Sequence, residues 1–147
     1  MLIQIILAAG LISTTVAIQA LFMSAGMRAF KWYEENRIMV VGRRPTMVTV
    51  IWVLFLIIPI FMDVTLWATC YYLRGDLRSF EEALYFSTVT FTTVGYGDVV
   101  PGREWRQLAT FEAINGWIIF GWATALIIAA VQRLYLRADP PLGSGRQ

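Results

Sequence analysis

The sequence predicts an all-α membrane protein, and three observations support this fold class. Hydrophobic residues make up 58% of the 147 residues and charged residues only 15%, whereas soluble domains are about 45–50% apolar. Three apolar stretches are each long enough to cross a bilayer as a helix, which takes about 20 residues. Residues 74–107, between the second and third stretch, are too polar to span. The length fits one domain.

The first apolar stretch predicts a transmembrane helix over residues 1–23. No charge precedes Arg28, and a secretory signal peptide is disfavoured because the stretch has neither a basic leading segment nor a convincing cleavage site. Residues 24–46 form a basic linker, which is either an amphipathic helix on the cytoplasmic leaflet or a charged connection. In both cases we expect anionic lipid headgroups to interact with its basic residues, Arg28, Lys31, Arg37, Arg43 and Arg44.

The second and third spans are predicted over residues 47–73 and 108–135. Between them, Ser79 followed by Glu82 matches a capping box and predicts a short helix over residues 80–91. Such a helix is about 18 Å long, roughly half a bilayer. Irregular backbone at that depth must be surrounded by protein or water, so this helix should enter an assembly and return. Residues 136–147 are expected to be a disordered cytoplasmic tail.

Basic residues set the expected orientation. They concentrate between spans one and two and again after span three, at Arg133 and Arg137, so both regions should face the cytoplasm. The N-terminus and the segment between the second and third span then lie outside, and the C-terminus lies inside. We therefore expect a multi-pass protein of the cell membrane.

Residues 92–98 read Thr-Thr-Val-Gly-Tyr-Gly-Asp. Gly95 and Gly97 allow the positive φ angles that a Cβ disfavours. The segment resembles the filter of tetrameric potassium channels, and residues 47–135 resemble the pore domain of the bacterial two-helix type: outer helix, pore helix, filter loop and inner helix. The N-terminal helix is an addition. The resemblance implies a homotetramer with a filter of Thr93, Val94, Gly95, Tyr96 and Gly97, in which the oxygens of Thr93, Val94, Gly95 and Tyr96 bind permeant K⁺.

Four residues are candidate supports for this filter: Thr92, Asp98, Tyr85 and Glu112. Tyr85 lies where an aromatic residue of the family bonds the filter aspartate, so a bond to Asp98 is expected. Val89 occupies a position at which some bacterial relatives have a glutamate. Because intramembrane acids usually face protein or water, we expect Glu112 to lie behind the filter and to bond the Thr88 or Thr90 hydroxyl. Asp63 should approach the same region.

The remaining candidate residues lie on the third span. Counting from the filter, the face lining the cavity and gate should comprise Ile118, Gly121, Ala125 and Ala129. Gly116 is either a hinge or a small residue that permits close helix packing, and packing is favoured. The first span should be peripheral and pack outside the second.

The predicted function is passive, potassium-selective conduction. A non-selective cation channel would usually have an altered filter, and the pore subunit of a partner-driven K⁺ uptake system would carry four degenerate filters on a longer chain. An enzyme is not expected, since the chain has no histidine and no nucleophile beside a base. The net charge of +2 is too small to indicate nucleic-acid binding.

Overall fold

The computed structural model describes residues 1–35, 45–75 and 77–136. In these ranges the chain is helical and contains no strand. A 3₁₀ turn, Arg103–Trp105, and a π turn, Gln132–Leu136, flank the last long helix. The α-helices are α1 (Leu2–Glu35), α2 (Pro45–Leu73), α3 (Phe80–Phe91) and α4 (Arg106–Val131). The all-α prediction is therefore confirmed.

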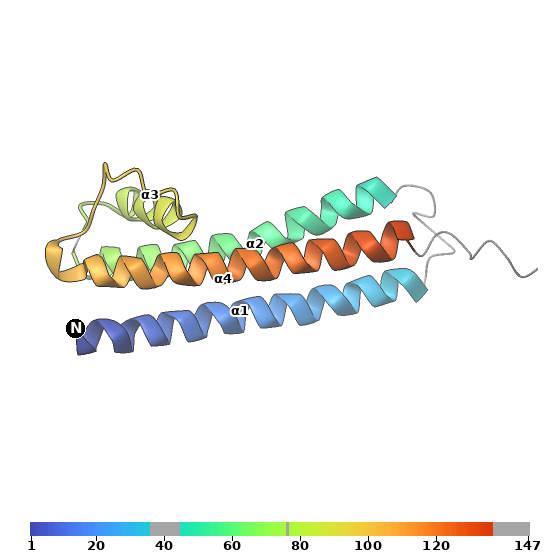
Figure 1. Ribbon diagram of the computed structural model, residues 1–147, viewed down its shortest axis with the longest axis horizontal. Coiled ribbons are helices and arrows are strands. Elements are labelled where there is room, and N and C mark those ends of the chain that lie inside the picture. Colours follow the sequence, from blue (N-terminus) through green and yellow to red (C-terminus); the bar gives the residue numbers. More distant parts are fainter. Residues whose placement is uncertain (36–44, 76, 137–147) are drawn as a thin grey trace, which may run out of the picture.

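Three helical segments are long and apolar enough to cross a membrane: Leu2–Ala29, Thr46–Leu73 and Arg103–Tyr135. In Figure 1 the three long helices run side by side, while the short α3 lies at one end of the bundle. The N-terminus lies at that same end. Helix α3 packs on α2 and α4, and α1 lies on the opposite side of α4 from α3 (Figure 1).

Helix α1 differs from expectation in length and in packing. It continues through Glu35 instead of ending near residue 23, so residues 24–35 do not form a separate amphipathic helix; residues 36–44 of the predicted linker lie outside the described residues. It contacts α2, as expected, and in addition it contacts α4, which the sequence analysis did not predict. The reason is a buried stripe on α1 in which polar residues need partners. These polar residues are Gln4, Thr15 and Gln19.

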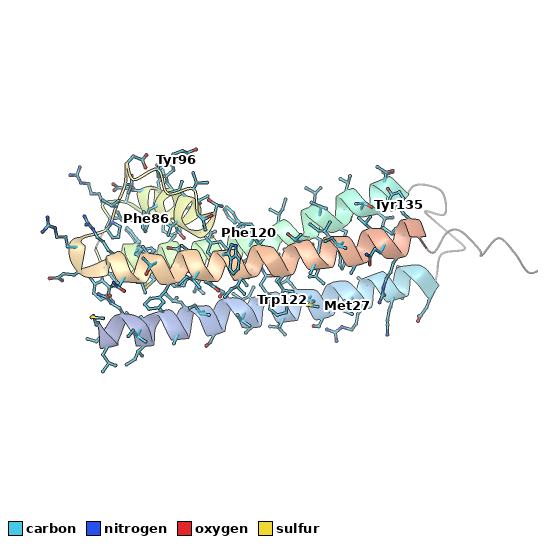
Figure 2. The ribbon with its side chains drawn as sticks, in the orientation of Figure 1. Met27, Phe86, Tyr96, Phe120, Trp122 and Tyr135 are labelled. Atoms are coloured by element: carbon cyan, nitrogen blue, oxygen red, sulfur yellow. The ribbon has the colours of Figure 1, made fainter. Side chains whose placement is uncertain are left out.

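The core lies where α2, α3 and α4 meet. Trp67 and Tyr71 of α2 are fully buried, as are Phe91 of α3 and Ile119 of α4. The rings of Tyr71 and Phe86 meet edge to face with centroids 5.1 Å apart, an arrangement that aromatic pairs favour. This core fixes α3 against the two longer helices and thereby positions the loop that follows it (Figure 2).

Candidate functional site

Helix α3 begins at a side-chain cap, as predicted. The Glu82 backbone N–H donates to Ser79 Oγ at 3.1 Å, which satisfies one of the free donors at the helix N-terminus. The Glu82 carboxylate accepts from the backbone N–H of Arg78 at 3.0 Å, where a full capping box would bond that of Ser79. The observed bounds, Phe80–Phe91, agree with the predicted helix over residues 80–91.

Backbone dihedrals alternate in the segment that follows. Gly95 and Gly97 have φ angles of 52° and 78°, as expected, and Thr93 has a φ of 61°. The sequence did not predict the third value, because a β-branched residue rarely adopts positive φ. A left-handed residue other than glycine costs about 1–2 kcal/mol, and such strain concentrates at functional sites.

The start of this segment is tied to the end of α3. The backbone N–H of Thr93 donates to the Thr90 carbonyl at 2.9 Å, and that of Gly95 donates to the Val89 carbonyl at 3.0 Å. The Thr92 hydroxyl donates to the Thr88 carbonyl at 2.7 Å. The bonds from the Thr93 and Gly95 N–H groups occupy the Thr90 and Val89 carbonyls near the end of the helix. The loop is therefore a rigid extension of the helix.

Beyond these bonds, the segment projects away from the rest of the chain. The exposed fraction is 52% for Val94 and 72% for Tyr96, and Figure 2 shows Tyr96 at the outer edge of the loop. A Cβ added at Gly95 or Gly97 would meet no atom within 4 Å. The glycines are thus required by their dihedral angles, not by crowding within this chain.

The expected bond between Tyr85 and Asp98 is present. The Tyr85 hydroxyl donates to Asp98 Oδ2 at 2.7 Å, and the Val99 backbone N–H donates to Asp98 Oδ1 at 3.0 Å. The bond from Tyr85 stabilises the carboxylate and lowers the pKa of Asp98, while the same bond raises the pKa of Tyr85. This pair connects the exposed face of α3 to the residue directly after the filter segment.

Glu112 joins three helices through its carboxylate. Ser87 Oγ of α3 donates to Oε1 at 2.5 Å, and the Tyr71 hydroxyl of α2 donates to Oε2 at 2.8 Å. Ser87 Oγ also lies 2.9 Å from the Val64 carbonyl of α2, so the single Ser87 proton is shared between these two acceptors. Glu112, Ser87 and Tyr71, which we call the buried brace, are all fully buried. The brace is made wholly of bonds between different helices.

The expected location of Glu112 against α3 is correct, but the expected partners are wrong. The Thr88 hydroxyl donates instead to the Leu84 carbonyl at 2.7 Å and lies on the exposed side of α3. Ser87 lies on the buried face with Ala83 and Phe86. The helical spacing of 83, 86 and 87 is the sequence signal that would have identified Ser87.

Asp63 bonds α1 instead of joining the buried brace. Gln19 Nε2 donates to Asp63 Oδ2 at 3.2 Å, and in the described part of the chain Asp63 Oδ1 has no hydrogen-bond partner. Asn115 Nδ2 of α4 donates to the Thr15 hydroxyl at 2.9 Å. Helix α1 therefore contacts both pore-domain helices through buried polar pairs. The sequence analysis missed Thr15, Gln19 and Asn115.

Two groups of residues on α4 were given roles from the sequence: the glycine Gly116 and the face predicted to line the cavity. Gly116 lies against the end of α3, where an added Cβ would lie 1.9 Å from the Phe91 carbonyl oxygen, which supports the packing interpretation over the hinge. An added Cβ at Gly121 would meet nothing within 4 Å. The four residues predicted to line the cavity are all exposed in the single chain and follow helical spacing: Ile118, Gly121, Ala125 and Ala129.

A family model described as "Ion channel" matches residues 59–133, just over half of the chain. The chain belongs to this ion-channel family. The matched region runs from the middle of α2 through α3, the filter segment and the whole of α4. The protein is therefore a channel and not an enzyme.

Relatives of this channel match it over short segments. It is 40% identical over 45 residues to "Two-pore potassium channel 4" of Arabidopsis thaliana, covering 31% of this chain and 16% of the relative. It is 36% identical over 75 residues to "Inward rectifier potassium channel Kirbac3.1" of Paramagnetospirillum magnetotacticum, a match that covers 46% of this chain and 25% of the relative. It is 41% identical over 46 residues to "Protein LctB" of Bacillus caldotenax, covering 31% and 34%. No solved structure matches the chain.

Proposed function

We propose that this channel conducts K⁺ passively and selectively through four copies of the segment Thr93–Gly97 around one axis. Main-chain carbonyls replace the hydration shell of the ion in such a filter. Thr93, Val94, Gly95 and Tyr96 are the proposed ligands. Selectivity and the tetramer are both part of the proposal.

The alternating dihedrals carry this proposal. Positive φ occurs at Thr93, Gly95 and Gly97, while Val94 and Tyr96 between them stay outside that region. In an extended strand successive residues face opposite sides, but alternating left-handed residues turn successive carbonyls toward one side. Thr93 adopts this conformation despite its branched side chain. A row of carbonyls on one side is what four chains need to form stacked oxygen rings.

The exposed surfaces of the single chain support a homotetramer. Val94 and Tyr96 lack neighbours that would hold the filter in shape, and the proposed cavity face of α4 is open. In a four-fold assembly, copies of the same chain cover these surfaces. The names of two relatives as potassium channels support K⁺ as the permeant ion, and the unaltered Thr-Val-Gly-Tyr-Gly sequence favours selectivity over a non-selective pore.

The orientation follows from the arrangement of the ends. The N-terminus of α1 lies at the filter end of the bundle (Figure 1), and Gln4 Nε2 donates to the Glu104 carbonyl there. Arg28 and Lys31 lie toward the opposite end of α1. With basic residues facing the cytoplasm, the filter and N-terminus face outside the cell membrane, and Arg28 and Lys31 approach anionic headgroups.

Reversal potentials under bi-ionic K⁺ and Na⁺ test the function. We expect the wild type to show a large shift favouring K⁺, and Gly95→Ala to lose it, since a Cβ disfavours the 52° φ angle at this position. Gly10→Ala is the matched control, because Gly10 lies in α1 with nothing within 4 Å of an added Cβ. A wild-type reversal potential near zero would refute selectivity, and native mass spectrometry showing no tetramer would refute the assembly.

A further inference from the structure

An apolar groove opens between α1 and α4 at the end of the bundle away from the filter. It has a volume of about 190 Å³. Its walls are Met23 and Met27 of α1, Leu126, Ala129 and Ala130 of α4, and Trp52 of α2. Figure 2 shows the Met27 sulfur between the ribbons of α1 and α4. The lining carries one charged residue, Arg133, just beyond Ala129 and Ala130.

Gly26 of α1 lies directly against the Trp52 ring that lines the groove. An added Cβ there would lie 2.7 Å from Trp52 Cη2 and 2.9 Å from Phe55 Cε1. The glycine therefore lets the Trp52 ring, which lines the groove, approach α1 closely. Trp52 is held in turn by Phe55, with ring centroids 5.7 Å apart and an interplanar angle of 22°.

These features define the chemistry of an occupant. An apolar cavity of about 150 Å³ stays dry and takes up small apolar molecules, so a groove of this size and lining favours hydrocarbon over water. Arg133 at its edge favours a negative charge next to that hydrocarbon. In the described part of α1, Arg28 and Lys31 lie toward the same end of the bundle as this groove. An acyl chain joined to an anionic headgroup combines both properties.

We propose that the groove binds one acyl chain of an anionic phospholipid from the cytoplasmic leaflet, whose headgroup pairs with Arg133. The bound chain fills the space between α1 and α4 at the level of Ala129. Because Ala129 also belongs to the proposed cavity and gate face of α4, lipid occupancy connects the N-terminal helix to the proposed gate. The extra helix then serves to build this lipid site.

The proposal rests on the orientation given above, but its test requires no current. Purified channel is equilibrated in micelles with equal amounts of dioleoyl phosphatidylglycerol and dioleoyl phosphatidylcholine, and retained lipid is counted by native mass spectrometry. We expect wild type to retain phosphatidylglycerol preferentially and Arg133→Gln to weaken this about fivefold, the effect of one basic residue near anionic lipid. Arg106→Gln, which removes an exposed charge at the other end of α4, should have no effect.

A second pair of variants tests the acyl chain. Met23→Trp fills the groove and should reduce phosphatidylglycerol retention, whereas Leu21→Trp adds the same ring at a position 69% exposed and should not. If Met23→Trp does not assemble, Met27→Trp takes its place. Wild type should also prefer dioleoyl over dihexanoyl phosphatidylglycerol, and the groove-filled variant should lose that preference.

Three results would overturn the proposal. Equal retention of phosphatidylcholine and phosphatidylglycerol would refute the role of the anionic headgroup. Equal effects of Met23→Trp and Leu21→Trp would refute the groove as the binding site. Absence of retained lipid together with altered subunit number in the groove variants would mean that a second copy of the chain fills the site. If the wild-type channel retains phosphatidylglycerol but shows no K⁺ selectivity in bi-ionic recordings, the proposed function is refuted and the groove proposal stands.

Discussion

Gly116→Ala should disturb the filter from behind, because Gly116 lies where α4 crosses the end of α3. The added methyl group would lie 1.9 Å from the Phe91 carbonyl oxygen and 2.8 Å from its carbon. Cβ atoms essentially never approach other atoms closer than 3.0 Å, so the two backbones must separate by more than 1 Å. The obstacle is backbone, which cannot rotate aside as a side chain can.

The cost follows from the packing of this junction. Overpacking a well-filled core costs about 1–3 kcal/mol, against which alanine gains about 1 kcal/mol over glycine in helix propensity. Phe91 is the last residue of α3 and precedes Thr92 and Thr93. A displacement there moves the filter, so we expect both a lower melting temperature of the assembled channel and weaker K⁺ selectivity.

The assay compares Gly116→Ala with Gly10→Ala, whose added methyl group meets nothing within 4 Å. Thermal denaturation of the purified channel and bi-ionic reversal potentials are measured for both. The control gains helix propensity without a clash and should be at least as stable as wild type. Wild-type stability and selectivity in Gly116→Ala would refute the close approach of α4 to α3.

Three further predictions concern buried and exposed polar pairs. Glu112→Leu removes the acceptor of the buried Tyr71 hydroxyl and should destabilise the assembled channel by about 1–3 kcal/mol with selectivity retained; an unchanged denaturation midpoint would contradict the buried brace. Gln19→Leu leaves Asp63 without its bond from α1 and should lower the melting temperature of the assembled channel. An unchanged melting temperature would argue against α1 as an integral helix of the bundle. Tyr85→Phe removes the bond that lowers the pKa of Asp98. The Asp98 carboxylate is ionised above its pKa and becomes protonated as pH falls through it, so a raised pKa in the variant should make current decline at a higher external pH than in wild type. Coincident pH profiles would count against the pair.

Much of the fold was predictable because its signals are local. The bounds of α3 followed from Ser79, Glu82 and the loop after Phe91, all within one short segment. The long helices followed from apolar runs matched to bilayer thickness. The bond between Tyr85 and Asp98 was predictable from the family resemblance, because the two residues lie only 13 positions apart in one contiguous segment.

Contacts between distant helices were less predictable, because they depend on the rotation of each helix about its axis. Ser87 and Thr88 are adjacent on α3, but Ser87 is buried and Thr88 is exposed. An error of one position in the buried face therefore led to the wrong predicted partner for Glu112. The same uncertainty concealed the bonds of Thr15 and Gln19 on α1. Hydrophobic periodicity indicates which side is buried but not which polar atoms meet there.

The sequence by itself determined the membrane-spanning helices, the short α3 and a filter segment whose glycines tolerate positive φ. Only the tertiary structure decided that Thr93 adopts the same conformation, that Gly116 lies against Phe91, and that α1 contacts α4. The physical reason is that composition and local propensity act along the chain, whereas packing, buried hydrogen bonds and strain depend on atoms brought together from different helices.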